Sequence, residues 1–281
     1  MNNLTNYHSH TSFCDGKAPM EAFIAEAVRQ GFTSYGVSSH APLPFRTRWT
    51  IDDREQTGLY LQEFARLKRL YGDRIELYVG LEIDYMDEDQ QPANEYFQSL
   101  PLDYRIGSVH LLHSTQGEIV DIDTKPEVFR EHVRLHLGGD LKRVVLAYFD
   151  KLMRMIGRGG FDFIGHADKI SYNVSCCEPN ILGQQWYKDK ISEYFTFIAE
   201  KGAMIEVNTK TLHRNGFLYP NKEHFGLIRT LGIPVVVNSD AHLPELINSG
   251  RPEALRLLKA SGIGAVWQLE RGVWTEVPIG E

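Results

Sequence analysis

The sequence has few cysteines and no long apolar run. Its three cysteines, Cys14, Cys176 and Cys177, are an odd number, which excludes a disulfide framework and suits a reducing compartment. No apolar run approaches the roughly 18 residues that a membrane span needs. The first ten residues, MNNLTNYHSH, lack the basic and apolar segments of a signal peptide. We therefore expect a cytoplasmic protein with no membrane partner.

An excess of positive charge is also absent. The net charge of −7 argues against a nucleic-acid partner held by contacts to the phosphate backbone, because such proteins carry a basic face. The proportions of apolar and charged residues, 42% and 24%, are ordinary for a globular protein. The 11 histidines are the most unusual feature of the composition, and their positions decide the interpretation.

Short β-rich runs alternate with longer helical stretches along all 281 residues. The expected strands are Leu4–His8, Ser34–Ser39, Ile75–Glu82, Tyr104–His110, Phe161–His166, Ala203–Asn208 and Ile233–Ser239. The expected helices are Met20–Gln30, Gly58–Tyr71, Gln91–Ser99, Glu127–Ile156, Gln185–Lys201, Glu223–Leu231 and Glu253–Ala260. Several helices are followed by glycine and then by a strand, which is typical of βα units around a parallel sheet. No linker divides the chain, so we expect one α/β domain over residues 1–281.

Three further stretches have less regular patterns. Ala41–Asp53 and Ser175–Gly183 follow expected strands, so either could be an active-site loop. Gly264–Ile279 is expected to form one or two short strands with a turn at Arg271–Gly272, and the sequence indicates no role for it.

Each expected strand ends in a residue that can bind a metal ion or orient a ligand. In a βα barrel these ends converge on one face, where such enzymes carry their chemistry. Alternate residues of a strand point to the same side, so two pairs, His8 with His10 and Asp240 with His242, can each present two ligands to one place. The candidate ligands are His8, His10, Asp15, His40, Glu82, His110, His166, Asp240 and His242.

The ligand types indicate borderline transition metals. Imidazole suits zinc and iron, carboxylates also admit manganese, and no cysteine lies among the strand-end ligands. One ion would leave most of these ligands unused. We therefore expect two to three divalent ions that share a bridging carboxylate.

The ordered motifs HSH…D, SSHAP, GLE, GSVH, GHADK and NSDAH resemble the PHP (polymerase and histidinol phosphatase) family of phosphoesterases, and they extend from His8 to about His242. FCDG, EVNT followed by YP, and SDAHLPE are similar to the histidinol-phosphate phosphatase branch. The resemblance implies a distorted (β/α)7 barrel with three metals. Its implied ligand sets are His8, His10, Glu82 and Asp240 for the first ion, Glu82, His110 and His166 for the second, and Asp15, His40 and His242 for the third. Glu82, Asp240 and His242 would be the catalytic residues.

The implied reaction is hydrolysis of L-histidinol phosphate to L-histidinol and phosphate, a step of histidine biosynthesis. A hydroxide bridging two ions would attack the phosphorus, and the ions would neutralise charge on the phosphoryl oxygens. The alternatives are a protein-tyrosine or nucleotide phosphoesterase of the same family, an amidohydrolase-type C–N hydrolase, and a non-enzymatic metal-binding module. The sequence does not give the native metals or the oligomeric state.

Basic residues near the strand ends are expected to bind the small-molecule phosphomonoester. Lys169, Lys210 and Arg214 are the candidates, followed by Arg46 and Arg48 on a loop. Cys14 lacks the C-x5-R loop of cysteine phosphatases and is expected to be a packed side chain. The i, i+4 pair His132 and His136 is expected to lie on the surface, because it is remote from the strand ends.

Overall fold

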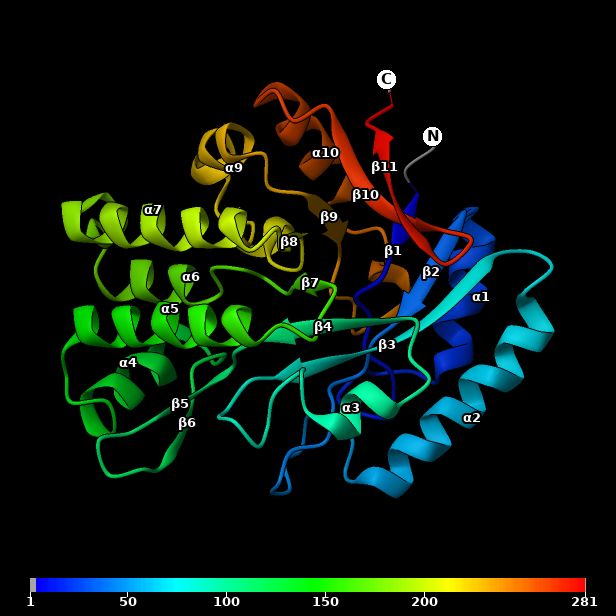
Figure 1. Cartoon of the computed structure of the whole chain (residues 1–281), viewed down its shortest axis with the longest axis horizontal. Coiled ribbons are helices and arrows are strands. Elements are labelled where there is room, and N and C mark those ends of the chain that lie inside the picture. The colour runs from blue at the N-terminus through cyan, green and yellow to red at the C-terminus, as the bar shows by residue number, and fades with distance from the viewer. Residues whose placement is uncertain (1–3, 281) are drawn as a thin grey trace.

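The computed structural model describes residues 4–280 and contains seven parallel strands in a nearly closed barrel (Figure 1). The strands are adjacent in the order β1-β2-β3-β4-β7-β8-β9. Their bounds are β1 Thr5–Asn6, β2 Ser34–Val37, β3 Glu76–Asp84, β4 Tyr104–Ser108, β7 Phe163–Ile164, β8 Met204–Asn208 and β9 Val235–Asn238. Beyond β1 and β9, Ser9 and Ala241 form a parallel bridge, which joins the two ends of the sheet. The predicted (β/α)7 barrel is confirmed.

The helices lie outside the barrel. In Figure 1, α1 and α2 flank β2 and β3, whereas α4 to α7 lie on the opposite side of the strands. Their bounds are α1 Met20–Gln30, α2 Arg54–Tyr71, α3 Glu95–Ser99, α4 Pro126–Leu135, α5 Leu141–Arg158, α6 Ile170–Cys177, α7 Gln185–Glu200, α8 Leu212–Asn215, α9 Phe225–Leu231 and α10 Arg251–Ala260, with short 3₁₀ turns at Ile181–Gly183, Lys222–His224 and Pro244–Leu246.

Helix termini follow the local sequence. The Asp53 carboxylate accepts a hydrogen bond from the Gln56 N–H at 2.9 Å, and this N-cap starts α2 four residues earlier than the apolar pattern predicts. At the ends of α1 and α9, Gly31 and Gly232 have positive φ, and the chain turns directly into the next strand.

The C-terminal stretch closes the barrel end opposite the strand ends that carry the candidate ligands. It forms an antiparallel hairpin, β10 Ala265–Glu270 and β11 Val273–Pro278, with the predicted turn at Arg271–Gly272. Trp274 of β11 packs edge-on against Tyr7 and Phe163, with ring centroids 5.3 and 5.8 Å away. The Tyr7 hydroxyl accepts a hydrogen bond from the Leu269 N–H at 2.8 Å. The stretch therefore covers the apolar interior of the barrel.

Three sequence expectations were wrong in detail. The stretch Glu127–Ile156 is not one helix, because Gly138 and Gly139 both adopt positive φ between α4 and α5. The expected irregular stretch Ser175–Gly183 begins inside α6. A second hairpin, β5 Leu111–His113 with β6 Ile119–Asp121, was missed altogether.

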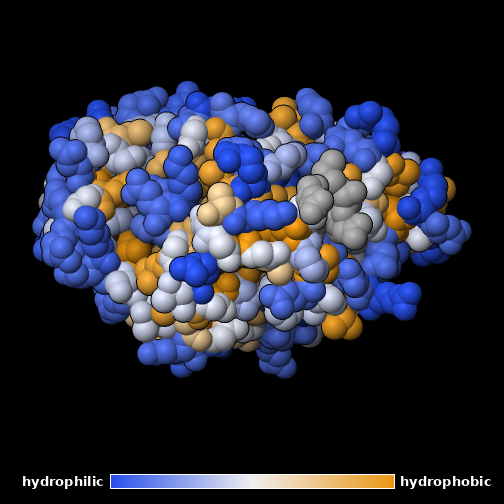
Figure 2. Space-filling view, turned by 90° about the horizontal axis from the view of Figure 1, so that it is seen from above, coloured by the Kyte–Doolittle hydropathy of each residue, from blue (hydrophilic) through white to orange (hydrophobic). Residues whose placement is uncertain are grey.

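Within residues 4–280, no helix has the length and apolar character needed to cross a membrane. Hydrophilic residues predominate on the face shown in Figure 2, and hydrophobic residues form small patches between them. This face lies over the elements at the top of Figure 1, which include α9, α10 and the hairpin β10–β11.

Candidate metal centre

The structure brings all nine predicted ligands together at the carboxyl ends of the barrel strands. Glu82 lies inside β3, and the other eight lie in the segments that follow β1, β2, β4, β7 and β9. Three groups of side chains place possible ligand atoms within 4.8 Å of one another. They are His8 with His10 and Glu82; His40 with Glu82 and His110; and His10 with Asp15, His40 and His242. His166 and Asp240 adjoin these groups, at 2.8 Å from Glu82 and 3.1 Å from His10 respectively.

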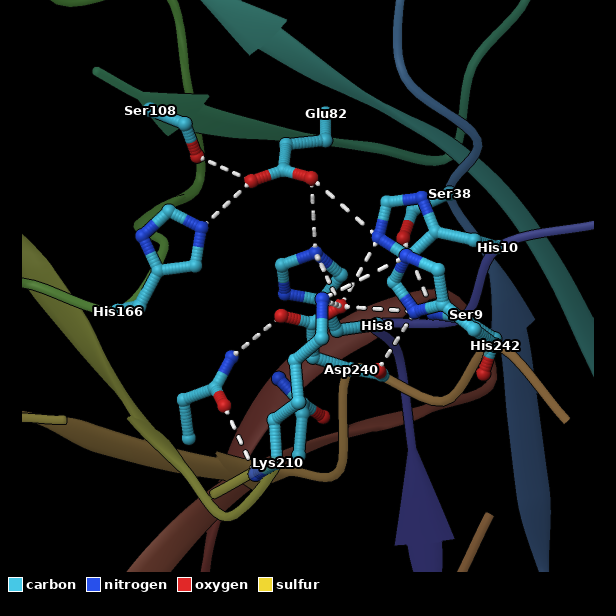
Figure 3. A network of polar contacts seen from close by, with 12 residues as sticks. His8, Ser9, His10, Ser38, Glu82, Ser108, His166, Lys210, Asp240 and His242 are labelled. Atoms are coloured by element: carbon cyan, nitrogen blue, oxygen red, sulfur yellow. Dashed lines mark hydrogen bonds and ion pairs between the residues drawn. The ribbon is translucent and has the colours of Figure 1, made fainter. Parts of the chain in front are cut away.

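The Glu82 carboxylate lies between two sets of imidazoles (Figure 3). Oε1 lies 2.8 Å from Nε2 of His166 and 3.5 Å from Nε2 of His110. Oε2 lies 3.0 Å from Nε2 of His8 and 3.4 Å from Nε2 of His10. Each oxygen therefore faces a different set of histidines, because Oε2 also lies near His40, and Glu82 could contribute a ligand atom to two neighbouring ion sites.

His40 lies between two of the ligand sets implied by the family resemblance. Its Nδ1 lies 3.1 Å from Oε2 of Glu82, and its ring is 4.2 Å from that of His10. Asp15 and His242, the other expected partners of His40, lie 3.2 Å from each other. The side-chain positions suit three neighbouring ion sites, with His40 adjacent to more than one.

Carboxylates behind the cluster orient the histidines. Nδ1 of His8 lies 2.7 Å from Oε1 of Glu206, and Nδ1 of His110 lies 3.0 Å from the Asp84 carboxylate. Such contacts fix the ring and its tautomer, so that the other nitrogen faces the metal. Glu206 lies near the end of the expected strand Ala203–Asn208, and Asp84 was not predicted. Asp84 lies two residues beyond Glu82 in β3. Because alternate residues of a strand point to the same side, its position could have been predicted from that of Glu82.

The surroundings keep the central carboxylates ionised. Burial would raise the pKa of Glu82, but His8, His40 and His110 outweigh this effect and hold the pKa well below its usual value. Burial would likewise raise the pKa of Asp240, which Lys210 and His8 hold well below its usual value. Both groups are therefore anionic candidate ligands at neutral pH.

Several candidate ligand atoms are buried and form no hydrogen bond, although His10 and His40 lie at ion-pair distance from the carboxylates of Asp240 and Glu82. Within residues 4–280 these include Nε2 of His10, Nδ1 of His40 and Oδ1 of Asp15. A buried polar atom without a partner is costly, and a bound cation would remove that cost. His166 and Asp240 also have positive backbone φ angles, at 30° and 49°, which residues other than glycine rarely adopt. Strain of this kind clusters at functional sites. The residues present fit a cluster of metal ions.

The predicted substrate-binding residues lie in different environments. Nζ of Lys210 is 3.2 Å from Oδ1 of Asp240, at the edge of the cluster. Lys169 is 6% exposed and pairs with Asp123 at 3.0 Å, so its ammonium already has a carboxylate partner. Arg214 is exposed on α8, and Arg46 and Arg48 are exposed on the loop before α2. The structure therefore brings Lys210 closest to the metal ligands.

The Cys14 side chain is packed, as the sequence analysis expected, whereas the pair His132 and His136 is half-buried and not fully on the surface. Burial raises the pKa of the Cys14 thiol to about 11, and its Sγ lies 3.6 Å from Nδ1 of His10. A thiol with this pKa is a poor nucleophile at neutral pH. His132 and His136 contact hairpin β5–β6, through the Asp121 carbonyl and the Glu118 carboxylate respectively.

A cavity of about 150 Å³ opens onto the cluster. Asp15, His40, His110 and His242 line it together with Lys210, and Trp49, Asp121 and Asp123 line the rest. The last three were not predicted to be site residues.

Comparisons with known proteins agree with this geometry. Residues 6–210 match the PHP domain family. The chain is 26% identical over 279 residues to a probable histidinol-phosphatase of Schizosaccharomyces pombe, covering 94% of this chain and 89% of that protein. It is 25% identical over 251 residues to the histidinol-phosphatase of Bacillus subtilis, covering 84% and 92% of the two chains.

A solved structure with a similar fold is the histidinol phosphate phosphatase of Lactococcus lactis in complex with zinc, L-histidinol and phosphate. Its TM-score is 0.73 at 17% identity, with 97% of this chain and 99% of that chain covered. A candidate histidinol phosphatase of Listeria monocytogenes has a TM-score of 0.79 at 22% identity, with coverage of 89% and 99%.

Proposed function

The chain belongs to the PHP domain family, and on that premise we propose that it is a metal-dependent phosphomonoesterase that hydrolyses L-histidinol phosphate to L-histidinol and phosphate. The Bacillus subtilis relative is named histidinol-phosphatase and the Schizosaccharomyces pombe relative probable histidinol-phosphatase, and each aligns with more than four-fifths of this chain. The structurally similar Lactococcus lactis enzyme binds zinc, L-histidinol and phosphate.

The main support for the proposal is that the two carboxylate oxygens of Glu82 face different sets of histidine side chains. His8, His10, Glu82 and Asp240 would hold one ion, Glu82, His110 and His166 a second, and Asp15, His40 and His242 a third. Zinc, iron or manganese suits this mixture of imidazole and carboxylate ligands.

Divalent ions, when bound, supply acidified water at neutral pH and positive charge near the phosphoryl group. The protein's own residues contribute binding and orientation. The ammonium of Lys210, beside Asp240, is placed to pair with a phosphoryl oxygen. Glu206 and Asp84 hold His8 and His110 in fixed orientations.

The proposal includes a cytoplasmic location and a small-molecule substrate, with no nucleic acid or membrane partner. The net charge of −7 and the free thiols of Cys14, Cys176 and Cys177 support this assignment.

A substrate panel tests the proposal. The metal-loaded protein should hydrolyse L-histidinol phosphate with a higher kcat/KM than phosphotyrosine peptides, nucleotides or phenyl phosphate. A clear preference for phosphotyrosine peptides would favour the protein-tyrosine phosphatase alternative.

Growth provides an independent test. Expression of the chain in a strain that lacks histidinol-phosphatase should restore growth without histidine. Soluble expression without rescue would contradict the proposed substrate.

A further inference from the structure

The residues that line the cavity beside the cluster are of two chemical kinds. The first group consists of candidate metal ligands and Lys210, which suit a phosphate group. The second group consists of Trp49, in the loop before α2, and of Asp121 and Asp123, at the end of β6 and just after it; none of the three belongs to a ligand motif. Two carboxylates beside a phosphate-binding centre would repel the substrate's phosphate, so their presence needs an explanation.

Asp123 has a cationic partner in the protein. Its Oδ2 lies 3.0 Å from Nζ of Lys169. Burial would raise the pKa of Asp123, but Lys169 and Lys210 hold the pKa well below its usual value. The charge of Asp123 is therefore balanced internally.

Asp121 has no such partner. It is half-buried at the end of β6, and among residues 4–280 its side chain accepts one hydrogen bond, from the Asp123 N–H at 2.7 Å, and forms no ion pair. Burial, together with the nearby Asp123 carboxylate, raises the pKa of Asp121 above its usual value. A cation that enters the cavity would therefore find one carboxylate without a counter-ion.

Trp49 is the aromatic residue that lines the same cavity as these carboxylates. Its indole packs edge-on against the rings of His40 and His110, with centroids 4.8 and 5.7 Å away. It also packs against the small apolar cluster of Leu43, Met86 and Leu111, which fixes it at the cavity edge.

We propose that Asp121 binds the ammonium group of the substrate, and that Trp49 packs against the substrate's ring. The inference rests on the proposed function, because L-histidinol phosphate carries a phosphate, a primary ammonium and an imidazole within one small molecule. The candidate metal centre and Lys210 would bind the phosphate, and Asp121 would bind the positively charged ammonium. Asp121 is thus assigned as a residue that determines specificity for cationic phosphomonoesters.

The test compares substrates with and without the ammonium. Metal-loaded parent enzyme and Asp121→Asn are assayed with L-histidinol phosphate and with 3-(imidazol-4-yl)propyl phosphate, which lacks only the amino group. The parent should prefer the amino substrate at least tenfold in kcat/KM, and Asp121→Asn should lose most of this preference. Asparagine keeps an oxygen that can accept the Asp123 N–H, so the hairpin turn is retained.

A binding measurement distinguishes the contribution of Asp121 from that of the phosphate-binding residues. In calorimetric titrations of the metal-loaded protein, Asp121→Asn should weaken L-histidinol binding at least tenfold and leave inorganic phosphate binding unchanged. Glu118→Gln is the matched control, because Glu118 lies on the same hairpin but is exposed and faces His136. The control should bind both ligands as the parent does.

The outcomes distinguish the two proposals. A parent that hydrolyses L-histidinol phosphate well but accepts the deamino analogue equally would overturn the ammonium site and leave the proposed function intact. An Asp121→Asn variant that keeps the parent's preference would overturn the ammonium site in the same way. A parent inactive on L-histidinol phosphate but active on other phosphomonoesters would overturn the proposed substrate and the inference together.

Discussion

Oε1 of Glu206 lies 2.7 Å from Nδ1 of His8, on the side of the imidazole ring opposite Glu82. Both carboxylates and the ring are buried. Glu206 also accepts hydrogen bonds from the His166 N–H at 2.8 Å and from the Asn238 side chain at 3.0 Å. One buried side chain in β8 therefore orients histidines that lie on both sides of Glu82.

Replacement of Glu206 should weaken metal binding without removing a ligand. Glu206→Gln keeps the size of the side chain but loses the charge that fixes the His8 tautomer. We expect metal affinity or activity to fall about 10- to 100-fold, as is typical for such supporting carboxylates. Elemental analysis after dialysis measures the loss of metal, and kcat/KM measures the loss of activity. Glu223→Gln, at an exposed position, is the control, and equal metal retention in both variants would disprove the role of Glu206.

Metal removal should abolish activity. Because nine ligands exceed what one ion can use, we expect two to three transition-metal ions per chain by elemental analysis. A chelator should remove activity, and zinc or manganese should restore it. Full activity in chelator, from protein without bound metal, would refute the metal-dependent mechanism.

Lys210 should act mainly on substrate binding. Its ammonium lies at the cluster edge, and the phosphate charge that it pairs with is present in both the ground and transition states. Lys210 should therefore stabilise the bound substrate and the transition state to a similar extent, so that its loss appears mainly in KM. We expect Lys210→Ala to raise KM at least tenfold, or about 1.4 kcal/mol, with bound metal unchanged. Lys222→Ala, an exposed control, should have the parent's KM. An unaltered KM and unaltered phosphate inhibition in Lys210→Ala would place Lys210 outside the binding site.

The sequence predicted the strand-end ligands because barrel topology brings the ends of parallel strands together whatever lies between them. It did not predict Asp121 and Asp123, because the hairpin that carries them was not recognised. A signal was present, since Val120 to Asp123 alternate apolar and acidic residues shortly after the turn at Gly117.

Other features depend on tertiary contacts that local sequence does not encode. Lys169 was expected to bind phosphate from its position after His166, but its partner Asp123 lies 46 positions earlier in the chain. The break at Gly138 and Gly139 was recognisable, because two adjacent glycines within a helical pattern favour its interruption.

Because of Lys151, the free energy of unfolding should vary with pH in the alkaline range. Lys151 is 4% exposed on α5 and donates a hydrogen bond to the Leu111 carbonyl at 2.8 Å, and burial lowers its pKa from 10.5 to about 8. Between these two values the unfolded chain holds the proton and the folded protein does not. Unfolding therefore takes up a proton, and the free energy of unfolding rises with pH in this window.

The contribution is on the order of 3 kcal/mol when complete. Urea denaturation of the parent and Lys151→Met at several pH values between 7.5 and 10.5 measures it, because the difference between the two cancels the other titrating groups. The parent should gain stability relative to the variant as pH rises. A difference that is constant or falls over this range would contradict the lowered pKa.

The central claim is that Glu82 would hold two ions, since its two oxygens face different sets of histidines. The most direct test is metal stoichiometry and turnover of Glu82→Gln beside Glu76→Gln, a control at the exposed start of the same strand. We predict that Glu82→Gln loses at least one ion per chain and that its kcat falls by about 10²-fold or more, whereas the control resembles the parent. A Glu82→Gln enzyme with its full complement of ions and near-normal kcat would contradict the account.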